Sequence, residues 1–279
     1  MIFWKVQASG NDFILIDCRN DKWPRSKYSR FAKQYCSRKV NVGADGILVV
    51  EGSKKANLRM RIFNADGSEA EMCGNGSRCF ALWVTKYIMK KNKCSVKFDT
   101  AAGMIEANVD ATDENAADVR VRLSDPAALS RDFSMVLSGR KTNVSFVNTG
   151  VPHAVIFTEN LDTVNVQKRG YEVRHHKKFY PAGTNVNFVQ MLRQDTIKIR
   201  TYERGVEDET LSCGTGTCAS AIIAALSIDD SKHQYKMKVL TRIGEELTVE
   251  FRKEPDGKIC DVWFCGKTFI VYEGNLLQG

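Results

Sequence analysis

Two cysteine–glycine blocks are the part of the sequence with the clearest chemical potential. A cysteine, a glycine, a polar residue and a second glycine occupy residues 73–76 and again residues 213–216. The two cysteines lie 213 − 73 = 140 residues apart, which is about half of the 279-residue chain. Glu69 and Glu209 keep the same spacing. A repeat at this distance predicts two related modules, each of which contributes one cysteine to a shared site.

The glycines of each block predict a tight turn into the start of a helix, because glycine leaves the backbone amides uncovered. A helix N-terminus carries about half a positive charge, so its first N–H groups bind a carboxylate and lower the pKa of a thiol below its free value of about 8.5. One thiolate that takes a proton and one thiol that gives a proton can invert a stereocentre held between two such helices. The field of the helices stabilises the developing charge, so this chemistry needs no cofactor.

The remaining cysteines give no sign of a disulfide framework or of a metal centre. The chain has nine cysteines, an odd number, and none of them forms a C-x-x-C pair. A zinc site or a set of structural disulfides is therefore not expected. A single cysteine block is also compatible with a small buried residue in a tight turn, but the second copy favours chemistry. A non-enzymatic redox or metal-binding protein remains an alternative, whose signature of clustered ligands is missing from the sequence.

The hydrophobic pattern predicts many short strands and few helices. Residues 58–62, 119–123 and 196–200 alternate between apolar and charged side chains, as half-buried strands do. Apolar residues recur with helical spacing from Cys79 to Ile88, directly after the first block. Residues 218–226, after the second block, are apolar nearly all round, which is typical of a buried helix. A third helix is expected on the surface at residues 28–36.

These elements predict a fold of the α/β class, α+β in type, with two pseudo-symmetric modules. Each module is expected to be a strand-rich curved sheet or barrel around one central helix, with the active site in the cleft between the modules. The acidic residues 110–115 are the best linker. We therefore expect an N-terminal module at residues 1–113, to which a C-terminal strand at 266–279 returns, and a C-terminal module at residues 114–265.

The composition argues against nucleic acid and against a membrane. The formal net charge is +8, from 41 Lys and Arg and 33 Asp and Glu, but the basic residues are scattered and carry few interleaved aromatic residues. No segment reaches the roughly 20 apolar residues that span a bilayer. The first residues contain no basic segment ahead of a long apolar stretch, so we expect no secretory signal and a cytoplasmic protein.

Seven segments of the chain closely resemble diaminopimelate epimerase, a family of pyridoxal-independent amino-acid epimerases. Any one of them is weak, but together they span most of the chain in the order of the family. They are residues 8–13, 63–69, 73–76, 152–153, 183–186, 203–205 and 209–216.

The resemblance implies interconversion of LL- and meso-2,6-diaminopimelate, in the synthesis of lysine and of peptidoglycan precursors, by a homodimer that uses no cofactor and no metal. Cys73 and Cys213 would be the acid and the base, which exchange roles with the direction of the reaction. His153 and Glu203 would help to deprotonate a cysteine or would anchor the substrate amine. The residues that would bind the substrate are Asn11, Asn64, Gly74, Asn75, Asn185, Glu203, Arg204, Gly214 and Thr215.

Two departures from the family pattern concern recognition of the distal end of the substrate. Val151 stands where many members carry an asparagine, and Gly46 stands where some members carry a glutamine. A related two-thiol racemase, similar to proline racemase or broader in its amino-acid specificity, therefore stays open as an alternative. Arg204 discriminates between the two, because a small cyclic substrate has no distal carboxylate for an arginine to bind.

Overall fold

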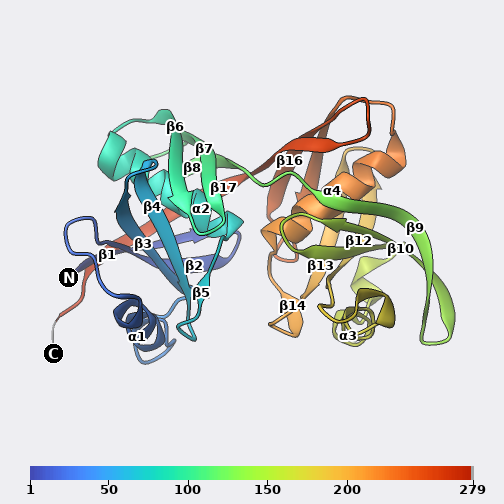
Figure 1. Ribbon diagram of the computed structural model, residues 1–279, viewed down its shortest axis with the longest axis horizontal. Coiled ribbons are helices and arrows are strands. Elements are labelled where there is room, and N and C mark those ends of the chain that lie inside the picture. The colour runs from blue at the N-terminus through green and yellow to red at the C-terminus, as the bar shows by residue number, and fades with distance from the viewer. Residues whose placement is uncertain (278–279) are drawn as a thin grey trace. The chain divides into compact units, whose positions relative to one another are not determined.

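The computed structural model describes residues 1–277 and divides the chain into two units (Figure 1). Unit 1 contains Met1–Val121 together with the chain from Cys265 onward, and unit 2 contains Arg122–Phe264. The change of unit thus follows Val121 and not residue 113. The reason is that the acidic residues 110–115 end one strand of unit 1 and turn into the next. Residues 278–279 of the expected returning strand lie outside the described part of the chain.

Eight strands close into a barrel in unit 1, within the described residues 1–277. Hydrogen bonds join them in the order β1–β2–β3–β4–β6–β7–β8–β17 and back to β1. Closure leaves no open sheet edge, which removes a site for unwanted strand pairing. The barrel strands are β1 (Ile2–Ala8), β2 (Asn11–Asp17), β3 (Gly46–Ser53), β4 (Asn57–Asn64), β6 (Lys93–Thr100), β7 (Gly103–Ala111), β8 (Ala116–Arg122) and the later part of β17 (Ile259–Asn275).

One helix, α2 (Gly74–Trp83), is enclosed by these strands. All of its residues are buried, and it packs against β1, β2, β4 and β7. It continues as one turn of π-helix at Val84–Met89. The helical spacing of apolar residues after the first cysteine block is therefore confirmed, and the enclosure explains why no charged face follows that block.

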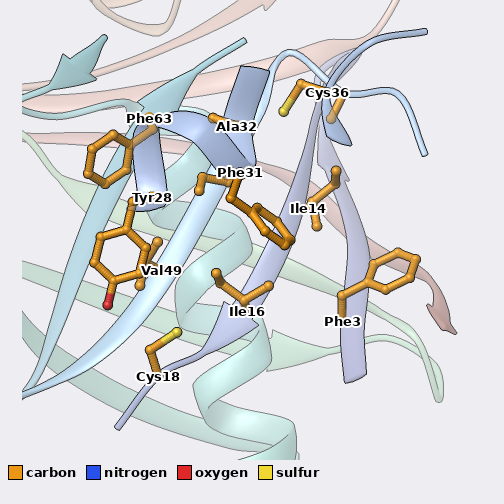
Figure 2. Close-up of a cluster of buried hydrophobic side chains, with 12 residues drawn as sticks. Phe3, Ile14, Ile16, Cys18, Tyr28, Phe31, Ala32, Cys36, Val49 and Phe63 are labelled. Atoms are coloured by element: carbon orange, nitrogen blue, oxygen red, sulfur yellow. The ribbon is translucent and has the colours of Figure 1, made fainter. Parts of the chain in front are cut away.

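A second helix, α1 (Arg25–Tyr35), covers the unit 1 barrel from outside. Its buried residues are Tyr28, Phe31 and Ala32, and its other positions are largely exposed. Figure 2 shows Tyr28 by Val49 and the ring of Phe31 directed toward Ile14, and these strand residues belong to the same hydrophobic cluster. The surface helix expected near residues 28–36 is thus an amphipathic helix with an apolar inner face.

Unit 2 repeats the element order of unit 1. A hairpin, a helix, a second hairpin, a short strand, an enclosed helix and a third hairpin follow one another in both units. The pair β2–β3 is parallel, and so is the pair of β11 (Pro152–Phe157) and β12 (Asn185–Arg193). The pair β4–β6 is also parallel, and so is the pair of β13 (Thr196–Glu203) and β15 (Gln234–Leu240). The helix α4 (Gly214–Ile228) takes the place of α2 and packs against β10, β11, β12, β13, β15 and β16.

The other elements have the following bounds. They are β5 (Glu69–Ala70) in unit 1, then β9 (Ala127–Leu137), β10 (Arg140–Asn148), β11 (Pro152–Phe157), α3 (Val166–Arg174), β12 (Asn185–Arg193), β13 (Thr196–Glu203), β14 (Asp208–Thr210), β15 (Gln234–Leu240) and β16 (Glu246–Lys253), with short 3-10 turns at Leu161–Thr163 and Lys177–Phe179.

The strand-rich α+β fold with a barrel and a central helix is confirmed. Within the described residues 1–277, no helix is long and apolar enough to cross a membrane.

An arginine–glutamate pair is repeated in front of each cysteine block. In unit 1 the Nε atom of Arg61 donates to Glu69 Oε1 at 2.7 Å and its Nη2 atom donates to Oε2 at 3.0 Å. In unit 2 Arg200 makes the same two bonds to Glu209, at 2.7 and 2.8 Å. Both pairs are mostly buried and bidentate, which makes them geometrically specific. The repeated glutamates therefore hold β5 and β14 to the preceding strand, close to the start of each enclosed helix.

Gly46 allows a close approach of β3 to β4. A Cβ atom on Gly46 would lie 2.5 Å from the backbone oxygen of Phe63, whereas one on Gly52 in the same strand would meet nothing within 4 Å. We expect Gly46→Ala to lower the free energy of unfolding by about 1–3 kcal/mol, the usual cost of overpacking. Gly52→Ala is the matched control and should stay within about 0.5 kcal/mol. Urea denaturation measures both, and equal stabilities of the two variants would contradict this packing argument.

Candidate active site

Cys73 is the N-cap residue of the enclosed helix α2. Its backbone is extended (φ −144°, ψ 123°) and the helix begins at Gly74. The Gly76 amide donates to Cys73 Sγ at 3.4 Å. A Cβ atom on Gly76 would lie 3.1 Å from Leu48 and 3.5 Å from the Cys73 Cβ, so a glycine fits this crowded turn. The predicted helix start after the first cysteine block is confirmed, and it directs backbone N–H groups toward the sulfur.

Asn11 faces Cys73 with an amide of fixed orientation. The Asn11 Nδ2 group donates to Asp45 Oδ2 at 2.6 Å, and Asn11 Oδ1 accepts from Cys73 Sγ at 3.6 Å. Asp45 also accepts from the guanidinium of Arg38 at 2.9 Å, and the same Arg38 nitrogen donates to Asp12 at 2.5 Å. Although burial opposes it, the hydrogen bonds from Arg38 and Lys5 hold the pKa of the Asp12 carboxyl below its usual value. These charged groups fix the loop that carries Asp45. Because Asp45 accepts from the Asn11 amide nitrogen, the Asn11 oxygen faces the thiol and accepts from it.

Asn75, the next predicted residue, is held from inside the barrel by Arg78. Arg78 is fully buried, and its Nη2 group donates to Asn75 Oδ1 at 2.8 Å and to Ser9 Oγ at 2.5 Å. Its Nη1 group donates to the Lys267 carbonyl at 3.0 Å. Arg78 was not among the residues predicted from the sequence. Its only signal was a charged residue near the start of a helix that is otherwise apolar or small.

Cys213 is the N-cap residue of α4, and the helix begins at Gly214. Its sulfur lies 3.5 Å from Thr215 Oγ1, and this hydroxyl lies 2.9 Å from Nε2 of His153. A Cβ atom on Gly216 would lie 3.3 Å from both Cys213 Sγ and His153 Cε1. The second predicted helix start is confirmed, and the structure brings three of the predicted residues of unit 2 into one hydrogen-bonded group.

His153 occupies a strand, where the sequence analysis predicted a loop. It lies in β11, pairs with Val147 and Asn185, and has no exposed surface. Burial, with a smaller effect from the charge of Arg204, lowers the pKa of His153 from 6.5 to about 3. The imidazole is therefore neutral near pH 7, and its reach toward Cys213 runs through the Thr215 hydroxyl.

Asn185 and Arg204 form a second hydrogen-bonded group in unit 2, and Glu203 precedes Arg204 in the chain. The Asn185 Oδ1 atom accepts from the Arg204 amide at 2.8 Å, and Arg204 Nη1 donates to the Ala182 carbonyl at 3.1 Å. Glu203 ends β13, and burial raises the pKa of its carboxyl. A carboxyl with a raised pKa can carry a proton closer to neutral pH than an exposed one can, which suits an acid–base role.

Asn64 forms its hydrogen bond with a residue outside the predicted site. Its Nδ2 group donates to Ser68 Oγ at 2.9 Å in the exposed turn after β4. Glu69, which the sequence analysis assigned to the turn and not to the site, holds Arg61 as described above. Among residues 1–277, no cluster of three or more His, Cys, Asp or Glu side chains has the geometry of a metal site.

The same arrangement of a cysteine at a helix start occurs in both units. Each unit has a cysteine at the N-cap of a buried helix, next to backbone amides that suit an anion. The polar residue after the first glycine is held by a buried side chain, Arg78 for Asn75 and His153 for Thr215. Each half-site can therefore hold a carboxylate and supply one sulfur for proton transfer.

Solved structures of other proteins share this fold over the whole chain. A phenazine biosynthesis protein of the PhzF family from Bacillus anthracis superposes with a TM-score of 0.76 at 16% identity, covering 100% of this chain and 99% of the other. A probable proline racemase from Agrobacterium radiobacter K84 gives 0.70 at 15% identity, covering 100% and 93%. The chain is therefore of the duplicated α+β class represented by these proteins.

Sequence similarity identifies the family within that class. The family model for diaminopimelate epimerase matches residues 3–128 and 145–258. The diaminopimelate epimerase of Aquifex aeolicus is 42% identical over 286 aligned positions, which cover 100% of this chain and 98% of the relative. The chain belongs to the diaminopimelate epimerase family, and the resemblance found in the sequence is confirmed.

The buried histidine makes stability depend on pH. Since the pKa of His153 is 6.5 when unfolded and about 3 when folded, only the unfolded chain gains a proton there between these values. The contribution of a neutral His153 to stability is therefore intact above pH 6.5 and is lost as the pH falls toward 3. We expect the free energy of unfolding to fall more steeply from about pH 7 to about pH 5 in the parent than in His153→Asn, which does not titrate. Urea denaturation at both pH values tests this, and parallel losses would contradict it.

Proposed function

We propose that this protein is a cofactor-independent epimerase that interconverts LL- and meso-2,6-diaminopimelate, with Cys73 and Cys213 as the acid–base pair. The carrying observation is that both cysteines are N-cap residues of enclosed helices at equivalent places in a duplicated fold. Membership of the diaminopimelate epimerase family supports the substrate.

The proposed reaction uses one sulfur on each face of the substrate α-carbon. A thiolate takes the α-proton, and the electron pair stays on the carbon as a carbanion delocalised into the carboxylate. The thiol of the other cysteine then gives its proton to the opposite face. One cysteine is thereby protonated and the other deprotonated, so the reverse reaction starts with the roles exchanged. Amides at Gly74, Asn75, Gly214 and Thr215 stabilise the charge on the carboxylate.

The other predicted residues are proposed to hold the rest of the substrate. Arg204 binds the distal carboxylate, because a guanidinium matches a carboxylate with two parallel hydrogen bonds. Asn11, Asn64 and Asn185 bind polar groups of the substrate. Glu203 exchanges a proton or binds the amine, supported by its burial and its raised pKa.

His153 is proposed to act on Cys213 and not on Cys73. The support is its contact with the Thr215 hydroxyl, which in turn lies 3.5 Å from Cys213 Sγ. Within the described residues the matching position of unit 1 holds an apolar side chain, Phe13, since Phe13 pairs with Gly46 as His153 pairs with Asn185.

The cellular setting follows from the substrate and is part of the proposal. Diaminopimelate is used for lysine and for peptidoglycan precursors, so the enzyme would act in amino-acid biosynthesis in the cytoplasm. We propose a homodimer on the strength of the family alone. Sedimentation of the purified protein measures the oligomeric state.

A related amino-acid racemase is the second candidate, because the fold is shared with a probable proline racemase. Such an enzyme would use the two cysteines on a smaller substrate. The two candidates differ in their need for a group that binds a distal carboxylate, which makes Arg204 the residue to test.

The two-thiol mechanism makes each cysteine indispensable. We expect Cys73→Ala and Cys213→Ala to lower kcat for epimerisation by about 10²–10⁴-fold each, the range of a lost general acid or base. The measurement is conversion of LL-diaminopimelate in deuterated water, under reducing conditions, without pyridoxal phosphate. Cys79→Ala is the control, since Cys79 is fully buried in α2. Failure of the parent to incorporate deuterium at the α-carbon would end the epimerase proposal, and a nearly normal rate in either variant would end the mechanism.

The distal carboxylate distinguishes the two candidates. We expect Arg204→Ala to lower kcat/KM for diaminopimelate by about 10- to 100-fold, the effect of losing hydrogen bonds to a charged group. Exchange of the α-hydrogen of a smaller amino acid should change much less. Arg193→Ala, at an exposed position at the end of β12, is the control. Equal losses on both substrates would favour the racemase.

A further inference from the structure

The two half-sites contain different side chains at equivalent places. Leu48 faces Ile62 across β3 and β4, and Asn187 faces Thr201 across β12 and β13. The fully or almost fully buried set around Cys73 is therefore apolar, while the set around Cys213 is polar. The first set is Phe13, Leu48 and Ile62, and the second is His153, Asn187 and Thr201.

Two members of each set lie against the second glycine of their cysteine block. A Cβ atom on Gly76 would meet Leu48 at 3.1 Å and Phe13 at 3.6 Å. A Cβ atom on Gly216 would meet Asn187 Oδ1 at 2.5 Å and His153 at 3.3 Å. Since apolar residues fill this place in unit 1, the fold does not require polar residues there. The polar set of unit 2 needs a different reason.

The orientation of the Asn187 amide is fixed from two sides. Thr201 Oγ1 donates to Asn187 Oδ1 at 3.0 Å, and Asn187 Nδ2 donates to the Ala154 carbonyl at 3.1 Å. The Asn187 Nδ2 atom carries a second hydrogen, and this nitrogen lies 3.1 Å from Nδ1 of His153. An amide nitrogen is only a donor, so Nδ1 of the imidazole is the acceptor.

The orientation of Asn187 determines the tautomer of His153. A neutral imidazole that accepts at Nδ1 carries its hydrogen on Nε2, and Nε2 lies 2.9 Å from Thr215 Oγ1. The Thr215 oxygen thus accepts from His153. Its own hydrogen remains to be donated, and Cys213 Sγ lies 3.5 Å away.

We propose that Asn187 is a positioning residue of the Cys213 half-site, which fixes His153 as a donor through Nε2 so that the Thr215 hydroxyl donates to the Cys213 sulfur. The assignment rests on the proposed function for its catalytic meaning, but the hydrogen-bond directions stand without it. It gives His153 the role of a fixed donor that stabilises a thiolate, and it excludes His153 as the base that deprotonates Cys213.

The tautomer is measured by nitrogen NMR of the imidazole rings in the full-length reduced protein. The chain has four histidines, and the His153→Asn spectrum assigns the resonance of His153. The proposal expects the hydrogen on Nε2 in the parent. In Asn187→Leu, which copies the residue of unit 1, and in Thr201→Val, which keeps the volume of threonine, the hydrogen should distribute between both ring nitrogens. A hydrogen on Nδ1 in the parent, or an unchanged tautomer in both variants, would overturn the proposal.

The effect on the sulfur is measured separately by the rate of iodoacetamide labelling, resolved by peptide mass spectrometry. The rate of labelling of Cys213 should fall by about fivefold in Asn187→Leu and in Thr201→Val, because the loss of one ordinary hydrogen bond to the sulfur changes an equilibrium by about this factor. Cys73 in the same sample is the internal reference, and Ile62→Val is the matched change beside Cys73 that should leave Cys213 unaffected. Unchanged labelling of Cys213 in both variants would also refute the proposal. If Asn187→Leu does not fold, Thr201→Val decides the matter alone.

These readouts are independent of the substrate. A protein that shows the Nε2 tautomer and the slowed labelling but does not exchange the α-hydrogen of diaminopimelate would retain the positioning role of Asn187 and lose the proposed function. A protein that exchanges the α-hydrogen of diaminopimelate but shows neither the Nε2 tautomer nor the slowed labelling would retain the proposed function and refute the positioning role of Asn187.

Discussion

The start of a helix inside a shell of strands is the constraint on which the rest of the structure depends. The first N–H groups of any α-helix lack a partner within the helix, and here both helices are enclosed. A buried donor without a partner costs about 1–3 kcal/mol, so such a turn requires an acceptor. Cys73 Sγ accepts from the Gly76 amide at 3.4 Å, and a carboxylate would satisfy further donors. The N–H groups that would cost stability without an acceptor are therefore suited to binding an anionic substrate.

The duplicated parts of the structure serve this constraint. The glycines allow the sulfur and the surrounding side chains to approach the first turn, and the bidentate pairs Arg61–Glu69 and Arg200–Glu209 hold the strands in front of it. In each ladder the glutamate lies opposite the residue two positions after the arginine, so both pairs are diagonal pairs on one face of the sheet. The repeated features are thus those that position a cysteine at a helix start.

The sequence predicted the features that depend on local rules. The two glycine turns, the enclosed helices after them and the alternating strands were correct, because glycine, hydrophobic periodicity and strand alternation act within a few residues. The loop assigned to His153 was wrong. The proline before it suggested a break, but Pro152 is the first residue of a strand, a position where proline costs no ladder hydrogen bond. The change of unit was placed too early, because the acidic turn is polar for the ordinary reason that it is exposed.

The side chains that orient the site could not be predicted, because their role depends on contacts between distant strands. Asn187 is an unremarkable polar residue in a sequence, and Arg78 resembles any surface arginine of a helix. Only the register of β11 with β12 places Asn187 beside His153, and only the enclosure of α2 gives Arg78 no surface. The internal repeat contained a usable signal, since polar residues replace the apolar Leu48 and Ile62 at matching positions.

This divergence has a chemical reason in the proposed reaction of two thiols. Two identical half-sites would give both sulfurs the same affinity for a proton, whereas the proposed inversion starts from one thiol and one thiolate. At Cys73 the sulfur accepts from the Gly76 amide and also donates to the fixed Asn11 oxygen. At Cys213 the direction set by Asn187 favours a thiolate. The acceptor Asn11 at Cys73 and the donor Thr215 at Cys213 therefore make the two half-sites unequal toward a proton, as the proposed two-thiol reaction requires.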